Sequence, residues 1–222
     1  MCGRFTSTVD PQLLAERFGI ALPEGIERRF NIAPTQHVLA VVGERGERAA
    51  RLLRWGLVPH WANDRKIGFK MINARAETVA ERPTYRTLLA KHRCLILADG
   101  FYEWRVDPDG VKRPVRFTLA GGAPFAFAGL NAFWRDPESD EVLESCTIIT
   151  TTANALVAPV HDRMPVILPR DVEDAWLDPS LDREQALLML RPLAVDLMSA
   201  RDASTLVNSA RNDAPELLDP LS

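Results

Sequence analysis

The sequence lacks the features that mark several specialised classes of protein. No apolar run in its 222 residues approaches the ~20 residues of a membrane-spanning helix. The opening stretch MCGRFTSTVD has no apolar core of a secretory signal, so we expect a soluble, cytoplasmic protein. Its three cysteines, Cys2, Cys94 and Cys146, form no C-x-x-C spacing, which argues for a reducing compartment and against a disulfide framework.

Motifs for metals and phosphate loops are missing too. Neither H-E-x-x-H nor a Cys/His cluster occurs, and Gly121-Gly122 is not followed by Gly-Lys-Ser/Thr. We therefore expect neither a metal nor a cofactor. The net charge of −3 does not indicate nucleic-acid binding by itself, although a local basic groove is enough for it.

The pattern of apolar residues predicts an α+β fold in a single domain spanning 1–222. Hydrophobic residues make up 46% of the chain, which is ordinary for a globular protein with a real core. Strands are expected over 37–42, 47–56, 115–119, 124–130 and 141–151, and over 93–104 as two strands joined by an Asp99-Gly100 turn. Short helices are expected over 10–19, 82–92, 170–177 and 182–190. Since strands predominate without regular βα alternation, the sheet should be mainly antiparallel.

A cysteine directly behind the initiator methionine raises a chemical question. If Met1 is removed, Cys2 carries a free amine and a thiol on adjacent carbons, a pair that no internal cysteine has. The pair is useful for capturing an aldehyde, because the amine forms an imine and the thiol then closes a five-membered ring. Intramolecular closure of this kind reaches effective molarities of ~10⁵–10⁸ M.

Five stretches are unusual in ways that core packing does not require: RRFNIAPTQ, RWGLVPHW, INARAET, ADGFYEW and TTANALVAPVHDRMPVIL. Each has a structural alternative. Trp55 and Trp61 are either core residues or platforms that stack on unpaired bases, and Asn73 is either a turn residue or a polar group of a site. Glu103 faces either solvent or an aromatic interior that would raise its pKa for proton transfer. His161 has charged neighbours that make a chemical role credible.

In order along the chain, MCGRF, FNIAPTQ, RWGLVPHW, NARAET, ADGFYEW and HDRMPVIL resemble the SOS response-associated peptidase (SRAP) family of abasic-site processing proteins. The resemblance runs from Cys2 to about Leu168, and more loosely to VNSARND. It implies a SRAP-like, barrel-like sheet with flanking short helices. Leu97 stands where the family often has proline, a difference within a strand.

The resemblance also implies a mechanism and a set of residues. After Met1 is removed, the cysteine crosslinks to an abasic site in single-stranded DNA as a thiazolidine that shields the lesion, with peptidase and weak lyase activity beside it. The catalytic residues implied are Cys2, Asn73, Glu103 and His161. The DNA-contacting residues implied are Arg4, Arg75, Arg163, Trp55 and Pro59.

Two other functions remain open from the sequence. N-terminal nucleophile amidohydrolases, such as glutamine amidotransferase domains, also begin Met-Cys-Gly and use the terminal amine as a base. A non-enzymatic single-strand binder would use Trp55 and Trp61 for stacking and leave Cys2 unmodified. For the abasic-site function we expect a cytoplasmic monomer without membrane association, associated with the nucleoid when bound to DNA.

Overall fold

The structure is a computed structural model that describes residues 2–44 and 46–219. Its strands are β1 (Arg4–Ser7), β2 (Arg29–Ile32), β3 (His37–Glu44), β4 (Glu47–Trp55), β5 (Asn73–Arg75), β6 (Arg93–Ala98), β7 (Gly100–Val106), β8 (Lys112–Leu119), β9 (Phe125–Arg135), β10 (Val142–Thr152), β11 (Arg163–Pro165), β12 (Ile167–Leu168) and β13 (Met198–Asp202). Its α-helices are α1 (Pro11–Phe18), α2 (Pro83–Lys91), α3 (Glu173–Leu177) and α4 (Arg183–Leu188). Its 3-10 helices are η1 (Arg65–Lys70), η2 (Arg170–Val172), η3 (Val195–Leu197), η4 (Thr205–Asn208) and η5 (Pro215–Leu218).

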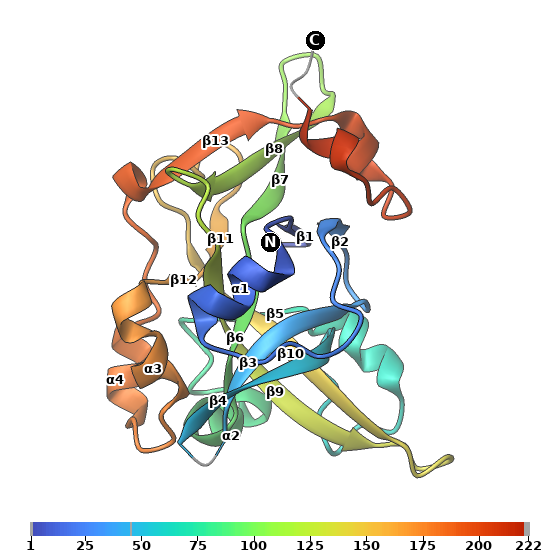
Figure 1. Cartoon of the computed structure of the whole chain (residues 1–222), viewed down its shortest axis with the longest axis vertical. Coiled ribbons are helices and arrows are strands. Elements are labelled where there is room, and N and C mark those ends of the chain that lie inside the picture. The colour runs from blue at the N-terminus through green and yellow to red at the C-terminus, as the bar shows by residue number, and fades with distance from the viewer. Residues whose placement is uncertain (1, 45, 220–222) are drawn as a thin grey trace.

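Strands β3, β4, β6, β9 and β10 close into a barrel in the lower part of Figure 1. β3 pairs antiparallel with β4 and β6, β6 pairs antiparallel with β9, and β9 pairs antiparallel with β10. A parallel pairing of β10 with β4, which places Ser145 opposite Arg54, completes the ring. Closure removes the exposed edges that an open sheet would leave. The predicted α+β class and barrel-like, mainly antiparallel sheet are therefore confirmed.

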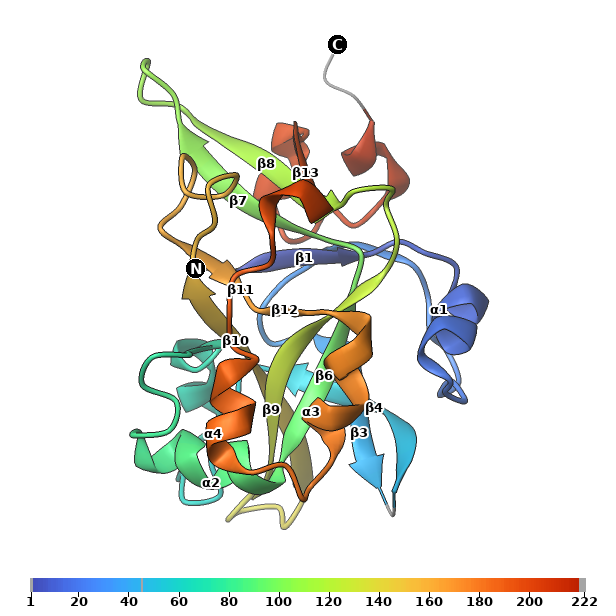
Figure 2. The same ribbon diagram turned by 90° about the vertical axis from the view of Figure 1, so that its left-hand side faces the viewer.

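A second sheet, with strand order β13-β8-β7-β1-β2, lies above the barrel in Figures 1 and 2. Its aromatic side chains join the interior of the barrel. The ring of Phe5 meets Trp55 of β4 edge-on at 5.1 Å between centroids, and Phe101 stacks on Phe117 at 5.1 Å. Burying each such ring stabilises the fold by about 1.5–3 kcal/mol. The N-terminal strand β1 is thus part of the core.

Alternate residues of the barrel strands face two different cores, as strand geometry requires. In β6, Cys94 and Ile96 point into the cluster that contains Phe5 and Phe101. Their neighbour Leu95 packs on the other side, in the cluster that the helices cover. Every residue of β6 is consequently buried, which explains the apolar run from Cys94 to Ala98.

The α-helices form where the sequence predicts them, although the segment expected over 170–177 begins with the 3-10 helix η2, and η1, η3, η4 and η5 were not predicted. None of the described helices is long and apolar enough to cross a bilayer. At α1, the Asp10 side chain accepts a hydrogen bond from the Gln12 amide at 2.8 Å, and Gly19 ends the helix with φ 63°. At α4, Asp182 accepts from the Gln185 amide at 2.9 Å. The turn expected between β3 and β4 includes Arg45, which lies outside the described residues.

The strands on either side of Asp99 are confirmed, but the link between them is not a hairpin turn. β6 pairs with β3 and β9, whereas β7 pairs with β1 and β8, so the chain passes from the barrel to the second sheet at this point. Gly100 is needed there because an added Cβ would lie 2.7 Å from Nε of Arg116 and 2.9 Å from Oγ1 of Thr6.

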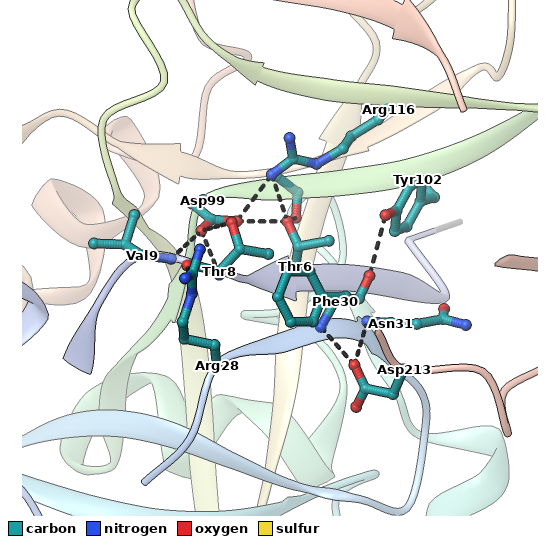
Figure 3. A network of polar contacts seen from close by, with 11 residues as sticks. Thr6, Thr8, Val9, Arg28, Phe30, Asn31, Asp99, Tyr102, Arg116 and Asp213 are labelled. Atoms are coloured by element: carbon teal, nitrogen blue, oxygen red, sulfur yellow. Dashed lines mark hydrogen bonds and ion pairs between the residues drawn. The ribbon is translucent and has the colours of Figure 1, made fainter. Parts of the chain in front are cut away.

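The Asp99 carboxylate, 2% exposed, binds β1 and the residues that follow it (Figure 3). It accepts hydrogen bonds from Oγ1 of Thr6 at 2.5 Å, Oγ1 of Thr8 at 2.7 Å and the Val9 amide at 2.8 Å. The Thr8 amide also donates to it, and Arg116 completes the network at 3.0 Å. These bonds satisfy a buried charge and at the same time fix the strand that begins just after Cys2.

We expect Asp99→Ala to lower the free energy of unfolding by about 3–5 kcal/mol, because it leaves the buried Arg116 guanidinium without its counter-charge. Urea denaturation measures this. The control is Asp219→Ala, which removes an exposed carboxylate. Equal stability of the two variants would contradict the role assigned to Asp99.

Candidate active site

Cys2 is completely buried and lies two residues before the start of β1. Its thiol makes a long, weak hydrogen bond to the Arg4 carbonyl, at 4.0 Å, and its side chain belongs to the interior core. Burial, followed by the nearby charge of Glu103, raises the pKa of the Cys2 thiol far above its ordinary value. The thiol is therefore held in its protonated form.

Asn73, the first residue of β5, holds the backbone of Cys2. β5 runs parallel to β10, which places Asn73 opposite Ile148. The Asn73 side-chain amide donates to the Cys2 carbonyl at 2.9 Å. Its Oδ1 is buried and accepts no hydrogen bond from the described residues. A buried acceptor without a donor is costly, so Oδ1 is a ready partner for an N–H or O–H group that enters the site.

Glu103 of β7 is buried, at 3% exposure, which settles its orientation in favour of the interior. The pKa of Glu103 is raised from 4.5 to about 7, chiefly by burial and to a smaller extent by the negative charge of Asp162. Cys2 and Glu103 belong to neighbouring segments, because β1, which follows Cys2, pairs with β7 and places Arg4 opposite Tyr102. A carboxyl group with a pKa near neutrality can both donate and accept a proton under physiological conditions.

His161 lies between the 153–160 loop and β11, with its side chain 31% exposed. Its Nδ1 lies 3.0 Å from the Arg163 amide and 2.9 Å from Oδ1 of Asp162. Nδ1 cannot accept from the amide and donate to the carboxylate at once. Burial lowers the pKa of His161, so we assign the neutral ring, with Nδ1 accepting from Arg163 and the proton on Nε2.

The three arginines expected at the DNA differ in how they are engaged. Arg163 binds both oxygens of Glu77, at 2.7 and 2.9 Å, and the Thr150 carbonyl at 2.6 Å. Arg4 donates from one terminal nitrogen to Asn31 and to a carbonyl near the C-terminus. Arg75 is exposed, and its side chain makes no hydrogen bond or ion pair within residues 2–44 and 46–219. Arg75 is thus the cation readiest to meet a phosphate.

The expectation that Trp55 contacts DNA needs correction. Trp55 is 0% exposed, and its indole N–H donates to the Ile72 carbonyl at 2.9 Å, so no face of the ring is open to a base. Pro59 is buried as well, but it lines a cavity of about 480 Å³ together with Trp61. Trp61 is 54% exposed and Phe69 is 61% exposed. Phe69 is an exposed aromatic residue that the sequence analysis did not single out, although it lies among basic residues in RKIGFK.

The molecule is a closed-barrel protein in which the buried Cys2 is bound by Asn73 and precedes a strand that pairs with the strand of Glu103, whose pKa is about 7. Within the described ranges, no three side chains of His, Cys, Asp or Glu converge to hold a metal ion. The family model described as SOS response associated peptidase (SRAP) matches residues 1–210, and the chain belongs to that family. This finding does not support the amidotransferase alternative.

The relatives and solved structures agree with this assignment. The chain is 46% identical over 224 residues to the abasic site processing protein YoqW of Bacillus subtilis (strain 168), covering 99% of both chains. It is 34% identical over 201 residues to the abasic site processing protein HMCES of Gallus gallus, covering 80% of this chain and 59% of that protein. A Bacteroides thetaiotaomicron structure, 24% identical, shares the fold over 100% of both chains with a TM-score of 0.91. A phage-related protein from Bordetella bronchiseptica, 30% identical, gives a TM-score of 0.70 over 90% of this chain and 93% of that one.

The raised pKa of Glu103 predicts how the free energy of unfolding depends on pH. The folded protein keeps a proton that the unfolded chain releases between pH 4.5 and about 7, so this group's contribution to stability is complete below pH 4.5 and is lost as the pH rises through 7. Glu103→Gln abolishes that loss. Its free energy of unfolding relative to the wild type should therefore rise from about pH 5 to about pH 8, by up to ~1.4 kcal/mol per pH unit. Urea denaturation at several pH values checks this, and a difference that does not change with pH contradicts it.

Proposed function

We propose that this protein captures abasic sites in single-stranded DNA by forming a covalent thiazolidine at Cys2 once Met1 has been removed. The observation that supports this most is the hydrogen bond from Asn73 to the Cys2 carbonyl, beside a carboxyl group whose pKa is about 7. The names of relatives such as YoqW and HMCES, abasic site processing proteins, point to the same substrate.

The protonation states suggest the order of bond formation. Because burial keeps the Cys2 thiol protonated, the terminal amine makes the first bond, to the aldehyde carbon C1′ of the open sugar. Free α-amines have pKa values of ~7.7–8.0, so a useful fraction of the amine is neutral near pH 7. The carbinolamine then loses water, and the departing hydroxyl takes a proton from Glu103.

The thiol closes the ring in the second step. As sulfur adds to C1′ of the protonated imine, Glu103 takes the thiol proton back, and the C=N electron pair returns to the nitrogen, which keeps the proton it already carries. The condensation therefore releases a single water overall. Oδ1 of Asn73 accepts a hydrogen bond from the amine, and Nε2 of His161 donates its proton to the sugar oxygens. The imine also permits β-elimination of the 3′ phosphate, and rapid closure limits this lyase side reaction. Cleavage of the Met1–Cys2 bond by Cys2 itself would require Glu103 to take the thiol proton first.

The exposed aromatic residues favour an unpaired strand. Trp61 beside the cavity and Phe69 on η1 are open to stack on bases, and such stacking contributes about 1–3 kcal/mol per base. Arg75, two residues beyond Asn73 along β5, is placed for a phosphate that flanks the lesion. For Arg163, a phosphate contact requires the guanidinium to share or exchange its partner Glu77.

We expect Cys2→Ser to abolish the adduct with an abasic oligonucleotide, because serine offers the amine without a thiol to close the ring. The adduct is scored by denaturing gel electrophoresis. The control is Cys94→Ala, which removes another completely buried cysteine. A stable adduct in Cys2→Ser at the wild-type level would refute the mechanism.

We expect Glu103→Gln and His161→Ala each to slow adduct formation by about 10²-fold or more, since each removes a proton-transfer group. Single-turnover kinetics at saturating abasic DNA measures the rate, and fluorescence anisotropy measures the affinity for intact single strands. Glu138→Gln, in an exposed loop, is the control. A loss of affinity that matches the loss of rate would make these two residues binding groups instead.

A further inference from the structure

The segment 205–213, which we call the tail, lies beside the strands that present Cys2, although it is far from them in sequence. It comprises η4 and the turn that follows, at the upper right of Figure 1. Its contact with Arg4 spans 203 residues of chain. The proposed chemistry assigns no role to this segment, yet its hydrogen bonds converge on β1, β2 and β7.

Asn31 of β2 is the centre of these bonds, and it is completely buried. Its side-chain amide shares its two protons among the carbonyls of Val207 at 3.2 Å, Ser209 at 3.0 Å and Asn212 at 2.8 Å. Its Oδ1 accepts from the Arg4 guanidinium at 2.9 Å. One side chain therefore joins three points of the tail to the strand that follows Cys2.

Asp213 closes the edge of the second sheet (Figure 3). β2 is the last strand of that sheet, so its outward amides have no strand partner. The Asp213 carboxylate accepts from the Phe30 amide at 2.5 Å and the Asn31 amide at 3.1 Å, and it pairs with Arg29. The tail supplies the hydrogen bonds that a further strand would supply.

Two more contacts bring the tail to the neighbours of reactive residues. The Val207 carbonyl accepts a hydrogen bond at 2.7 Å from the guanidinium of Arg4, which lies two residues after Cys2. Oδ1 of Asn208 accepts a hydrogen bond at 2.7 Å from the indole N–H of Trp104, which directly follows Glu103. The tail thus binds both strands whose relative position sets the approach of Cys2 to Glu103.

We propose that the tail is a positioning element for Cys2 and Glu103, a role that rests on the proposed function. The tail residues act through Arg4, Asn31 and Trp104. Since a 1 Å misplacement of reacting groups costs about 10²-fold in rate, loosening the tail slows bond formation at C1′ and leaves the binding of DNA unchanged.

The test compares Asp213→Ala with Asp213→Asn, which keeps an oxygen acceptor for the two β2 amides. Single-turnover adduct formation is followed across concentrations of abasic oligonucleotide, with Asp219→Ala as the control for loss of an exposed carboxylate. We expect Asp213→Ala to lower the maximal rate by about ten-fold with an unchanged half-saturating DNA concentration. Asp213→Asn should recover most of that rate, and Asp219→Ala should match the wild type. Hydrogen exchange of the Phe5 and Thr6 amides should be faster in Asp213→Ala alone.

A wild-type maximal rate in Asp213→Ala would overturn the proposal. So would a rise in the half-saturating concentration that accounts for the whole effect, because the tail would then be a DNA-binding surface. If Asp213→Ala does not fold, Asp213→Asn decides the question. Its side-chain oxygen still accepts from the two β2 amides, so a maximal rate as low as that of Glu103→Gln would contradict the proposal. Absence of any adduct in the wild type and in Asp219→Ala refutes the proposed function itself, and the exchange rates then still decide whether the tail holds β1.

Discussion

Burial of β1, the strand of the second sheet whose Phe5 packs into the barrel interior, is the constraint on which the site depends. Chain termini are ordinarily the least ordered part of a domain. Here Phe5 packs into the barrel interior, Asp99 binds the backbone and side chains after it, and Asn31 connects Arg4 to the tail. These contacts turn a residue that would otherwise be free in solution into one held at a fixed place beside Asn73.

The same burial sets the protonation states of Cys2 and Glu103. Removing Cys2 and Glu103 from water disfavours the charged form of each, so the thiol stays protonated and the carboxyl group exchanges its proton near pH 7. A protein that used Cys2 as a resting thiolate would need the opposite environment, with a cation or a helix N-terminus close to the sulfur. The proposed mechanism therefore has the amine react first with the aldehyde, and it has the carboxyl group move protons in both steps.

Much of this was predictable from local sequence. Helix α1 carries its signals in Asp10, Pro11 and Gly19, and the apolar strands of the barrel follow from their own periodicity. The catalytic set Cys2, Asn73, Glu103 and His161 came from motif resemblance, and its roles remain predictions. What failed depended on long-range packing. Trp55 became a core residue because Phe5 and Ile72 enclose it, and the Asp99 turn became a corner because β7 pairs with β1. The polar strand β13 gave no local signal, since only its pairing with β8 makes it a strand.

The most direct test of the central claim is the intact mass of the protein after reaction with an abasic oligonucleotide. If both groups of Cys2 react, the adduct weighs as much as the Met1-free protein plus the uncleaved oligonucleotide, less a single water. Digestion should then place the residual sugar on the peptide that contains Cys2. An adduct that retains Met1, or one whose mass shows no loss of water, would contradict thiazolidine formation at the N-terminus.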